Sequence, residues 1–296
     1  MAPVTLVSLI FILRRLQPVT VVTSLYQADV VGMLAASLVR VCQRIVIQHD
    51  VQQFGWLGRW GKRRWSLPLA TQVVAVSQTV ADFLHIYFAV PQQKTWVIPN
   101  GVDTLRWSVG IRRLEPQQLP VVGMVGRLEP IKGAKYFLEA LNILQQEWQL
   151  APTAKLIGDG SLRSSLESYA ASHGLTRVEF RGFARDVARA IAPIDILIVP
   201  SLAEGFGLVV LEGMAARKVI IAADLPAVRE LIQDRINGYL FPVGDSRVLA
   251  ERLRDLLIHP QTIPQIVSQL DRWWVERGTA YDISTVVDQY QALLLA

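Results

Sequence analysis

The second half of the chain alternates short apolar segments with amphipathic ones, and this alternation restricts the fold more than any other feature. Apolar strands are predicted at 121–125, 154–158, 178–181, 195–199, 219–222 and 238–241. Helical patterns follow at 133–149, 162–173, 186–191, 207–217, 226–233 and 246–258. Strands that each lead into a helix form a parallel sheet covered on both faces. We therefore predict an α/β, doubly wound domain that binds ligands beyond the carboxyl ends of its strands.

The first half repeats the pattern less completely. Strands are predicted at 19–24, 44–48, 73–76 and 94–98, and helices at 5–16, 28–42 and 77–89. Four parallel strands leave an apolar sheet edge exposed, so we expect this first domain to lack an N-terminal part or to be covered by something else. The expected organisation is a first Rossmann-like domain at 1–107, a second at 108–280 and a C-terminal segment at 281–296, whose helix packs back on the first domain.

Composition and charge limit the classes of protein to which this chain could belong. Half of the residues (51%) are hydrophobic and 19% are charged, which favours a packed globular protein over a disordered one. The single cysteine, Cys42, excludes a disulfide framework and the usual zinc motifs, and a reducing cytoplasm fits best. Residues 1–107 carry ten Lys and Arg against four Asp, so an anionic surface or acceptor is expected for the first domain. No nucleic-acid-binding motif accompanies this charge.

The chain opens on an apolar run, Val4 to Leu13, that is followed by Arg14 and Arg15. The run is too short to span a bilayer, and its charges follow the apolar stretch rather than precede it. It predicts a buried helix, with a helix lying in a membrane interface as the alternative.

The segment from Glu204 to Glu212 carries the clearest chemical signal. Gly205-Phe206-Gly207 forms a turn after an apolar strand and leads into a helix that begins near Leu208. Such a turn presents free backbone N–H groups and the positive end of a helix dipole to an anion such as phosphate. The flanking carboxylates would instead suit sugar hydroxyls. The segment therefore predicts a nucleotide-sugar site, although each glutamate taken alone could be an ordinary surface acid.

Two cations occur at another strand end. Gly126-Arg127 follows the strand at 121–125, and Lys132 lies a few residues further on. Two fixed cations can stabilise a diphosphate leaving group, although a solvated loop would show the same residues. No Asp-x-Asp pair occurs in the chain, so the usual ligand pair for a metal-bound diphosphate is missing. We predict a site without a metal or cofactor, with the nucleoside-diphosphate sugar as substrate.

Three further features leave two interpretations open. His49 ends a predicted strand, where it could face substrate or be a structural histidine. The turns at 158–160 and 182–184 could receive a nucleobase or be turns only. The segment from Phe54 to Trp65 interleaves three tryptophans with four cations, as at a lipid headgroup layer, but a buried aromatic cluster is equally consistent.

Together these residues resemble the retaining GT-B glycosyltransferases of family 4. The matching pieces, in the family's order, are Val74-Ala-Val-Ser77, Ile98-Pro-Asn-Gly-Val-Asp103, Gly126-Arg-Leu with Lys132-Gly133, Gly158-Asp-Gly160, Pro200-Ser201, and Glu204-Gly-Phe-Gly with Glu212. Two departures stand out: roughly the first three strand units of the family are absent, and Leu225-Pro226 stands where many relatives have a Gly-Gly pair.

The resemblance implies a role for each site residue. Arg127 and Lys132, beside Gly126, would bind the donor diphosphate; Glu212 would hold the ribose, and Glu204 the transferred sugar. The amides of Gly205, Phe206, Gly207 and Leu208 would meet sugar and phosphate, and the backbone near Phe183 the base. His49 matches the family's cleft histidine, so His49 and Glu204 are the expected catalytic pair.

The resemblance also implies a reaction. We expect a retaining, hexosyl-type transfer from a nucleoside-diphosphate sugar to a saccharide or lipid-linked acceptor, as in polysaccharide biosynthesis, by a cytoplasmic protein in peripheral contact with an anionic membrane. The alternatives are a donor-binding subunit without full activity and half of a split enzyme completed by a partner chain. A GT-B sugar-nucleotide epimerase would share the architecture, but the Arg–Lys pair with two glutamates favours a transferase. The sequence leaves the base, the sugar and the linkage open.

Overall fold

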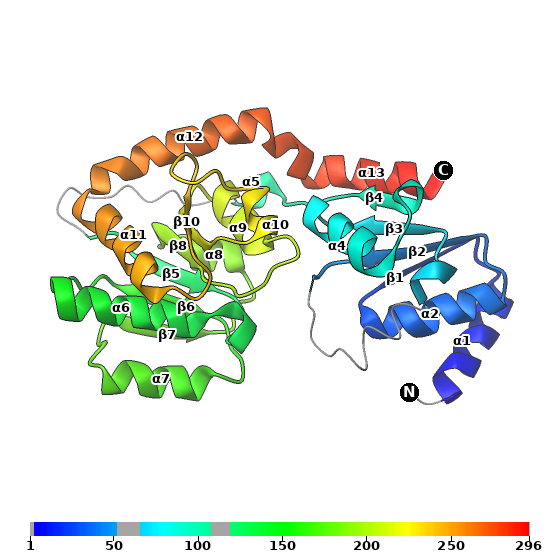
Figure 1. The fold of residues 1–296 in the computed structure, drawn as a ribbon, viewed down its shortest axis with the longest axis horizontal. Helices are drawn as coiled ribbons and strands as arrows, with labels where there is room; N and C mark the ends of the chain where they lie inside the picture. Colours follow the sequence, from blue (N-terminus) through cyan, green and yellow to red (C-terminus); the bar gives the residue numbers. More distant parts are fainter. Residues whose placement is uncertain (1–2, 52–65, 108–118, 296) are drawn as a thin grey trace. The chain divides into compact units, whose positions relative to one another are not determined.

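In a computed structural model, residues 3–51, 66–107 and 119–295 are described, and they form two parallel-sheet units (Figure 1). One compact unit consists of Met1–Asn100 with Val286–Ala296, and the other of Gly101–Thr285. The first division lies before the expected boundary at residue 107 because the short helix α5 (Thr104–Trp107) packs against helix α9 (Leu208–Ala215) of the second unit. The fold is therefore α/β with two Rossmann-like sheets, as the sequence predicted.

The second unit contains a six-stranded parallel sheet in the order β10-β9-β8-β5-β6-β7. Its strands are β5 (Val122–Val125), β6 (Ala154–Ile157), β7 (Val178–Gly182), β8 (Ile196–Val199), β9 (Val219–Ala223) and β10 (Tyr239–Phe241). The order reverses between β5 and β8, which are neighbours although two strands separate them in the chain. Ligands of such sheets bind at this reversal, beyond the strands' carboxyl ends.

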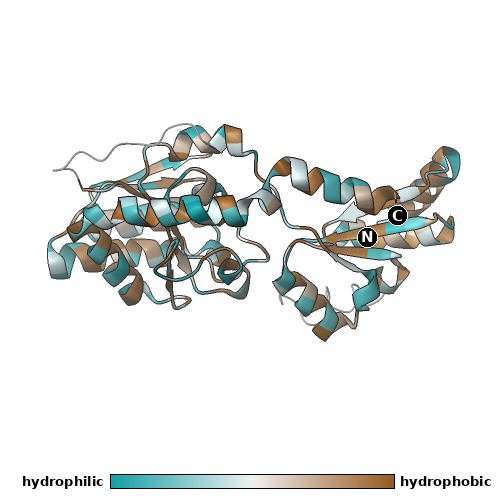
Figure 2. Ribbon diagram, turned by 90° about the horizontal axis from the view of Figure 1, so that it is seen from above, coloured by the Kyte–Doolittle hydropathy of each residue, from teal (hydrophilic) through white to brown (hydrophobic). Residues whose placement is uncertain are grey.

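The helices of this unit include all six that were predicted, together with α5 and a helix at 263–276 that were not. Besides α5 and α9 they are α6 (Ala134–Trp148), α7 (Arg163–Ser172), α8 (Val187–Ile191), α10 (Pro226–Arg229), α11 (Ser246–Ile258) and α12 (Ile263–Glu276), with 3-10 turns at Pro130–Lys132, Pro260–Thr262 and Gly278–Tyr281. Asp245 caps α11 by accepting from the amides of Arg247 and Val248, both at 3.0 Å. In Figure 2 hydrophobic and hydrophilic residues alternate along the long helices, as expected for helices with one face against a sheet.

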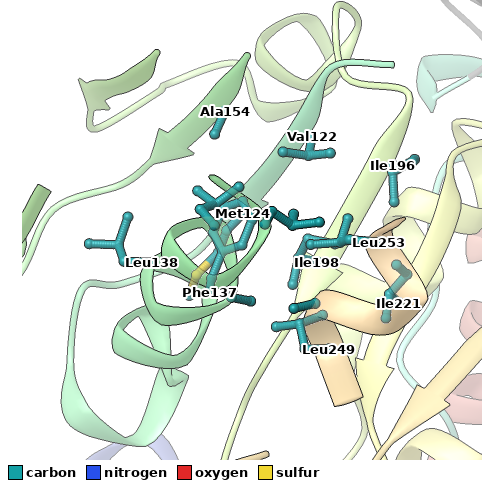
Figure 3. Close-up of a cluster of buried hydrophobic side chains, with 14 of the residues drawn as sticks. Val122, Met124, Phe137, Leu138, Ala154, Ile196, Ile198, Ile221, Leu249 and Leu253 are labelled. Atoms are coloured by element: carbon teal, nitrogen blue, oxygen red, sulfur yellow. The ribbon is translucent and has the colours of Figure 1, made fainter. Parts of the chain in front are cut away.

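The hydrophobic core of this unit lies between one face of the sheet and two of its helices. Alternate residues of the strands, including Val122, Met124, Ile196, Ile198 and Ile221, point to one face of the sheet and are at most 2% exposed. They pack against the apolar stripes of α6 and α11, represented by Phe137, Leu138, Leu249 and Leu253 (Figure 3). Because the sheet is covered on both faces, its central strands carry continuous apolar runs.

The first unit contains a four-stranded parallel sheet in the order β1-β2-β3-β4. Its strands are β1 (Thr20–Ser24), β2 (Gln43–Gln48), β3 (Gln72–Ala75) and β4 (Thr95–Val97). Its helices are α1 (Pro3–Leu16), α2 (Tyr26–Leu38), α4 (Gln78–Phe88) and α13 (Ile283–Leu295), with 3-10 turns at Leu67–Leu69 and Gln92–Lys94. The strand β1 is an edge of this sheet, and its Val22 is 47% exposed.

The helix α13 returns to the first unit. Val286 and Leu293 are buried in one cluster with Ile45, Val74 and Ile98 of the four-stranded sheet. The side-chain Nε2 of Gln43 also donates to the carbonyl oxygen of Leu293 at 2.9 Å. The last helix of the chain therefore covers a sheet built from its first hundred residues. Among the described helices, none is both long enough and apolar enough to cross a bilayer.

Candidate functional site

The loops that follow β5 and β8 meet at the reversal of strand order in the second unit. Gly133 ends the loop after β5 with a φ of +69°, and a Cβ there would lie 1.9 Å from the carbonyl oxygen of Pro200. The amide of Leu202 donates to the carbonyl of Ile131 at 2.8 Å. Only glycine permits this approach, which brings Lys132 of one loop next to Glu204 of the other.

Lys132 and Glu204 form the centre of this site. Lys132 Nζ lies 2.6 Å from Glu204 Oε1, and Ser201 Oγ donates to the same oxygen at 2.7 Å. Ser201 is 1% exposed and follows β8 directly after Pro200, so its hydroxyl is fixed in place. The pair places a cation and a carboxylate side by side at the carboxyl ends of β5 and β8. There the cation could bind a phosphate and the carboxylate could bind a sugar hydroxyl.

The turn at 205–207 leads into α9 as predicted. Gly207 is the N-cap residue, with a φ of +92° and no side chain to cap the helix. The first amides of a helix have no partner within it and carry its partial positive charge, so this end suits an anion. The Phe206 side chain, however, is buried against Tyr281, with ring centroids 6.0 Å apart. Phe206 can therefore contribute only its backbone to the site.

Glu212 lies one turn into α9 and is partly buried. Burial raises its pKa to about 7, and the nearby Arg106 of α5 opposes this rise. A carboxyl group with this pKa is present in both protonation states near neutral pH and can both donate and accept hydrogen bonds. The sequence predicted Glu212 for the site, but it gave no local signal for Arg106 beside it.

An apolar slot opens beside these groups, at the ends of β5, β6 and β7. It has a volume of about 250 Å³. Its walls include Gly126, Arg127, Ile157, Gly158 and Phe183. Phe183 is 78% exposed, an unusual position for a large apolar ring. Gly158 makes the slot possible, because its φ is +140° and a Cβ there would lie 1.9 Å from the carbonyl oxygen of Gly126. The slot is mostly apolar, which suits a nucleobase.

Arg127 lines the slot and lies five residues before Lys132 in the loop after β5. Its side chain is exposed, and it forms no ion pair within the described residues. The neighbouring Glu129 accepts two hydrogen bonds from Ser161, at 3.0 Å from the amide and 2.7 Å from the hydroxyl, which lower the pKa of Glu129. These bonds tie the loop after β5 to the loop after β6. Arg127 is thus held at the rim of the slot.

His49 lies in the first unit, after the end of β2. Its Nε2 is 3.0 Å from Ser24 Oγ at the end of β1, and burial lowers the pKa of the imidazole although Asp50 opposes the effect. Beneath it, Asp29 is fully buried and accepts from Thr23 Oγ1 at 2.9 Å and from Gln48 Nε2 at 2.7 Å. Asp29 therefore links Thr23 and Gln48, the residues that precede Ser24 and His49. The sequence analysis did not single out Asp29, although a lone acid in the otherwise apolar helix α2 indicates a buried polar contact.

One predicted feature cannot be placed: the segment from Phe54 to Trp65 lies outside the described residues. Among the described residues, no group of three His, Cys, Asp or Glu side chains is arranged to hold a metal ion.

Leu225-Pro226, which stands where many relatives have a Gly-Gly pair, begins α10. Arg229 of that helix forms two hydrogen bonds with Asp224, at 2.5 and 2.7 Å.

Comparison with known proteins connects these features to an enzyme family. Residues 1–106 match the profile of Glycosyltransferase Family 4, and residues 119–259 match that of Glycosyl transferases group 1. The putative glycosyltransferase EpsD of Bacillus subtilis is 30% identical over 166 residues, which are 55% of this chain and 43% of that protein. The chain thus spans less than half of the length of this curated relative.

Two other similarities extend over most of the chain. The UDP-Gal:alpha-D-GlcNAc-diphosphoundecaprenol alpha-1,3-galactosyltransferase of Escherichia coli is 25% identical over 264 residues, covering 81% of this chain and 67% of that enzyme. The crystal structure of Anabaena Alr3699/HepE in complex with UDP and glucose superposes with a TM-score of 0.84 at 25% identity, over 98% of this chain and 81% of the other. With both units matched by profiles of one enzyme family and by its fold, the chain belongs to the group 1 (family 4) GT-B glycosyltransferases.

Proposed function

We propose that this protein transfers a sugar, with retention of anomeric configuration, from a nucleoside-diphosphate sugar to a saccharide or lipid-linked acceptor. One observation carries the proposal. At the reversal of strand order in the second unit, an apolar slot, two cations, two carboxylates and a helix N-terminus follow one another along the same sheet edge. These are the partners that a base, a diphosphate and a sugar require.

The diphosphate would lie between Arg127, Lys132 and the start of α9. Its terminal phosphate gains negative charge as the bond to the sugar breaks, so fixed positive groups stabilise the transition state more than the bound substrate. Arg127 has no ion-pair partner among the described residues and is available to the phosphate. Lys132 would exchange part of its interaction with Glu204 for the phosphate oxygens.

The two carboxylates would address hydroxyl groups. Glu204 is held by Lys132 and Ser201 at the mouth of the site and would bind the transferred sugar. Glu212, with its pKa raised by burial, would hold the ribose hydroxyls. The base would occupy the slot beside Phe183. The bound nucleotide of the Anabaena protein is UDP, which makes a uridine nucleotide the first donor to test.

Transfer with retention would proceed on one face of the sugar through an oxocarbenium-like state. The departing phosphate would accept the proton of the acceptor hydroxyl, so that no protein nucleophile is required. His49 is the first unit's candidate for contact with the sugar. Because its pKa is lowered, the imidazole is neutral at pH 7 and can accept or donate a hydrogen bond. The Escherichia coli relative acts on a lipid-linked acceptor, which supports testing one here.

The experiment is a calorimetric titration with UDP and GDP, followed by a screen of their sugar conjugates for hydrolysis and for transfer to lipid-linked saccharides. We expect binding of one nucleoside diphosphate and turnover of its sugar conjugate. Lys132→Ala should weaken binding by roughly tenfold or more, since a charged hydrogen bond contributes about 1.5–3 kcal/mol. Lys135→Ala is the matched control, because Lys135 lies on the exposed side of α6 and pairs with Glu139.

Two results would count against the proposal. Equal affinities of the Lys132 and Lys135 variants would place the diphosphate elsewhere. Binding without turnover of any sugar nucleotide would instead favour a donor-binding subunit.

A further inference from the structure

Helix α1 presents an apolar stripe away from the protein interior. Val4, Val7 and Phe11 are spaced at i, i+3 and i+7, and they are 71%, 65% and 68% exposed. The opposite stripe, with Leu6, Leu9, Ile10 and Leu13, packs against Ala35 and Ala36 of α2 and accounts for the stability of the helix. The outward stripe therefore has no packing role among the described residues.

The same stripe becomes cationic at its C-terminal end. Arg15 lies eleven residues after Val4, or about three helical turns, so Arg14 and Arg15 continue the line of Val4, Val7 and Phe11. Both guanidinium groups are exposed and have no ion-pair partner in the described part of the chain. The helix thus carries apolar residues along most of one face and positive charge at one end of it.

Helix α2 extends both properties. Leu34 and Leu38 are exposed on it, and Arg40 follows its end. A cavity of about 480 Å³ lies between the ends of α1 and α2, lined by Arg14 and Arg40 and by the apolar side chains of Val19, Leu38 and Val41. Each helix C-terminus carries about half a negative charge, so three guanidinium groups leave this end of the unit positive.

Acids do not offset this charge. Between residues 3 and 42 the single acid is Asp29, which is fully buried and bonded to Thr23 and Gln48. A surface with exposed hydrocarbon, exposed arginines and no exposed acid is complementary to a layer that is hydrocarbon inside and anionic outside. The stripe also lies on the convex surface of a helix, which can enter such a layer, whereas a docked peptide helix needs a groove.

We propose that α1 and the end of α2 form a docking surface for an anionic lipid bilayer. Val4, Val7 and Phe11 enter the outer part of the hydrocarbon. Arg14, Arg15 and Arg40 bind lipid phosphates, and the cavity between Arg14 and Arg40 receives a headgroup. This surface uses none of the residues proposed for the donor site.

The test is vesicle flotation of the whole chain with phosphatidylcholine alone and with phosphatidylcholine mixed with phosphatidylglycerol. We expect flotation with the anionic vesicles and little with the neutral ones. Phe11→Asp should lower the partition coefficient more than tenfold, since burial of one such side chain contributes about 1.5–3 kcal/mol. Arg15→Glu should lower it at least fivefold, from about 1 kcal/mol per guanidinium near the surface.

Matched controls come from α12 of the second unit. Val275 is 80% exposed and Arg272 is exposed on the same helix, so Val275→Asp replaces another exposed apolar residue with an acid, and Arg272→Glu makes the same charge reversal, both away from the proposed surface. These variants should float like the unaltered protein. Calorimetric binding of the nucleoside diphosphate should be equal in all four variants, which separates this proposal from the proposed function.

Equal flotation of the Phe11 and Val275 variants would overturn the proposal, as would the absence of flotation of the unaltered protein. A third result would identify another occupant. If light scattering shows a dimer that Phe11→Asp converts to a monomer, and lipid has no effect, then a second copy covers this surface, through pairing at the β1 edge.

Discussion

Lys132 Nζ lies 2.6 Å from Glu204 Oε1, so the cation that should bind the donor phosphate is paired with the carboxylate that should bind the donor sugar. The two residues belong to different loops, brought together by the adjacency of β5 and β8. Because Glu204 also accepts from Ser201, the carboxylate keeps a partner when Lys132 turns to a phosphate. Binding of a phosphate to Lys132 would therefore weaken its pairing with Glu204 and leave the negative charge of Glu204 facing the sugar.

This coupling predicts opposite effects of two substitutions. Glu204→Gln removes the charge that neutralises Lys132, so the affinity for UDP alone should rise by about 1.4- to fivefold, a range set by the roughly 0.2–1 kcal/mol of a solvent-accessible ion pair. Transfer of the sugar should fall in the same variant. Calorimetry with UDP and an assay with the UDP sugar check the two parts. Weaker UDP binding in Glu204→Gln would show that Lys132 does not reach the phosphate.

The raised pKa of Glu212 predicts a pH dependence of stability. The carboxyl group is protonated more readily in the folded protein, where its pKa is about 7, than in the unfolded chain at its usual 4.5. The folded state then binds more protons between these values, so the free energy of unfolding should fall as pH rises from about 4.5 to 7. The shift corresponds to about 3 kcal/mol.

Glu212→Gln should remove this loss and be more stable than the unaltered protein above pH 7. Urea unfolding at pH 5 and pH 8 measures both slopes. Glu251→Gln serves as control, since Glu251 is exposed on α11. If the Glu212 and Glu251 variants lose stability to the same extent between these two pH values, Glu212 does not carry the effect.

The close approach of the loops after β5 and β8 predicts the effect of a single methyl group. Gly133→Ala places a Cβ 1.9 Å from the carbonyl oxygen of Pro200, in addition to the strain of its positive φ. It should lower the free energy of unfolding by more than the roughly 1–3 kcal/mol of backbone strain alone, and it should displace Lys132 from Glu204.

Gly174→Ala separates these two causes. Gly174 has a similar φ, +65°, but its nearest neighbour to an added Cβ is 3.8 Å away. Urea unfolding of both variants should show the larger loss for Gly133→Ala, and only this variant should lose affinity for the nucleoside diphosphate. Equal losses would mean that the loop after β8 moves aside without cost.

The buried carboxylate of Asp29 predicts a structural requirement in the first unit. Asp29→Ala leaves Thr23 Oγ1 and Gln48 Nε2 without their partner, so the free energy of unfolding should fall by about 2–5 kcal/mol. The NMR titration of the His49 ring should also change, because Gln48 and Thr23, which precede His49 and its partner Ser24, lose their common partner. Asp82→Ala is the control, as Asp82 is exposed and accepts a hydrogen bond from Gln78 at 2.7 Å. An unchanged His49 titration in Asp29→Ala would limit Asp29 to stability.

Local periodicity was sufficient for most of the elements. The six strands of the second unit lie within one residue of their predicted ends, because apolar runs bounded by glycine and polar residues have one stable arrangement in a covered parallel sheet. The helix α12 was not predicted, although Ile263, Ile266, Leu270 and Trp273 have helical spacing and are buried. The two prolines near its start, Pro260 and Pro264, masked this pattern.

The sequence by itself determined which residues could act in a nucleotide-sugar site, because glycine turns, cations and acids at strand ends are local features. Only the tertiary structure decided which of them meet. The strand order places Lys132 beside Glu204, which is 72 residues away, and buries Phe206 so that its backbone alone remains at the site. Strand order depends on which faces of distant helices and strands are buried together, and no short stretch of the chain contains that information.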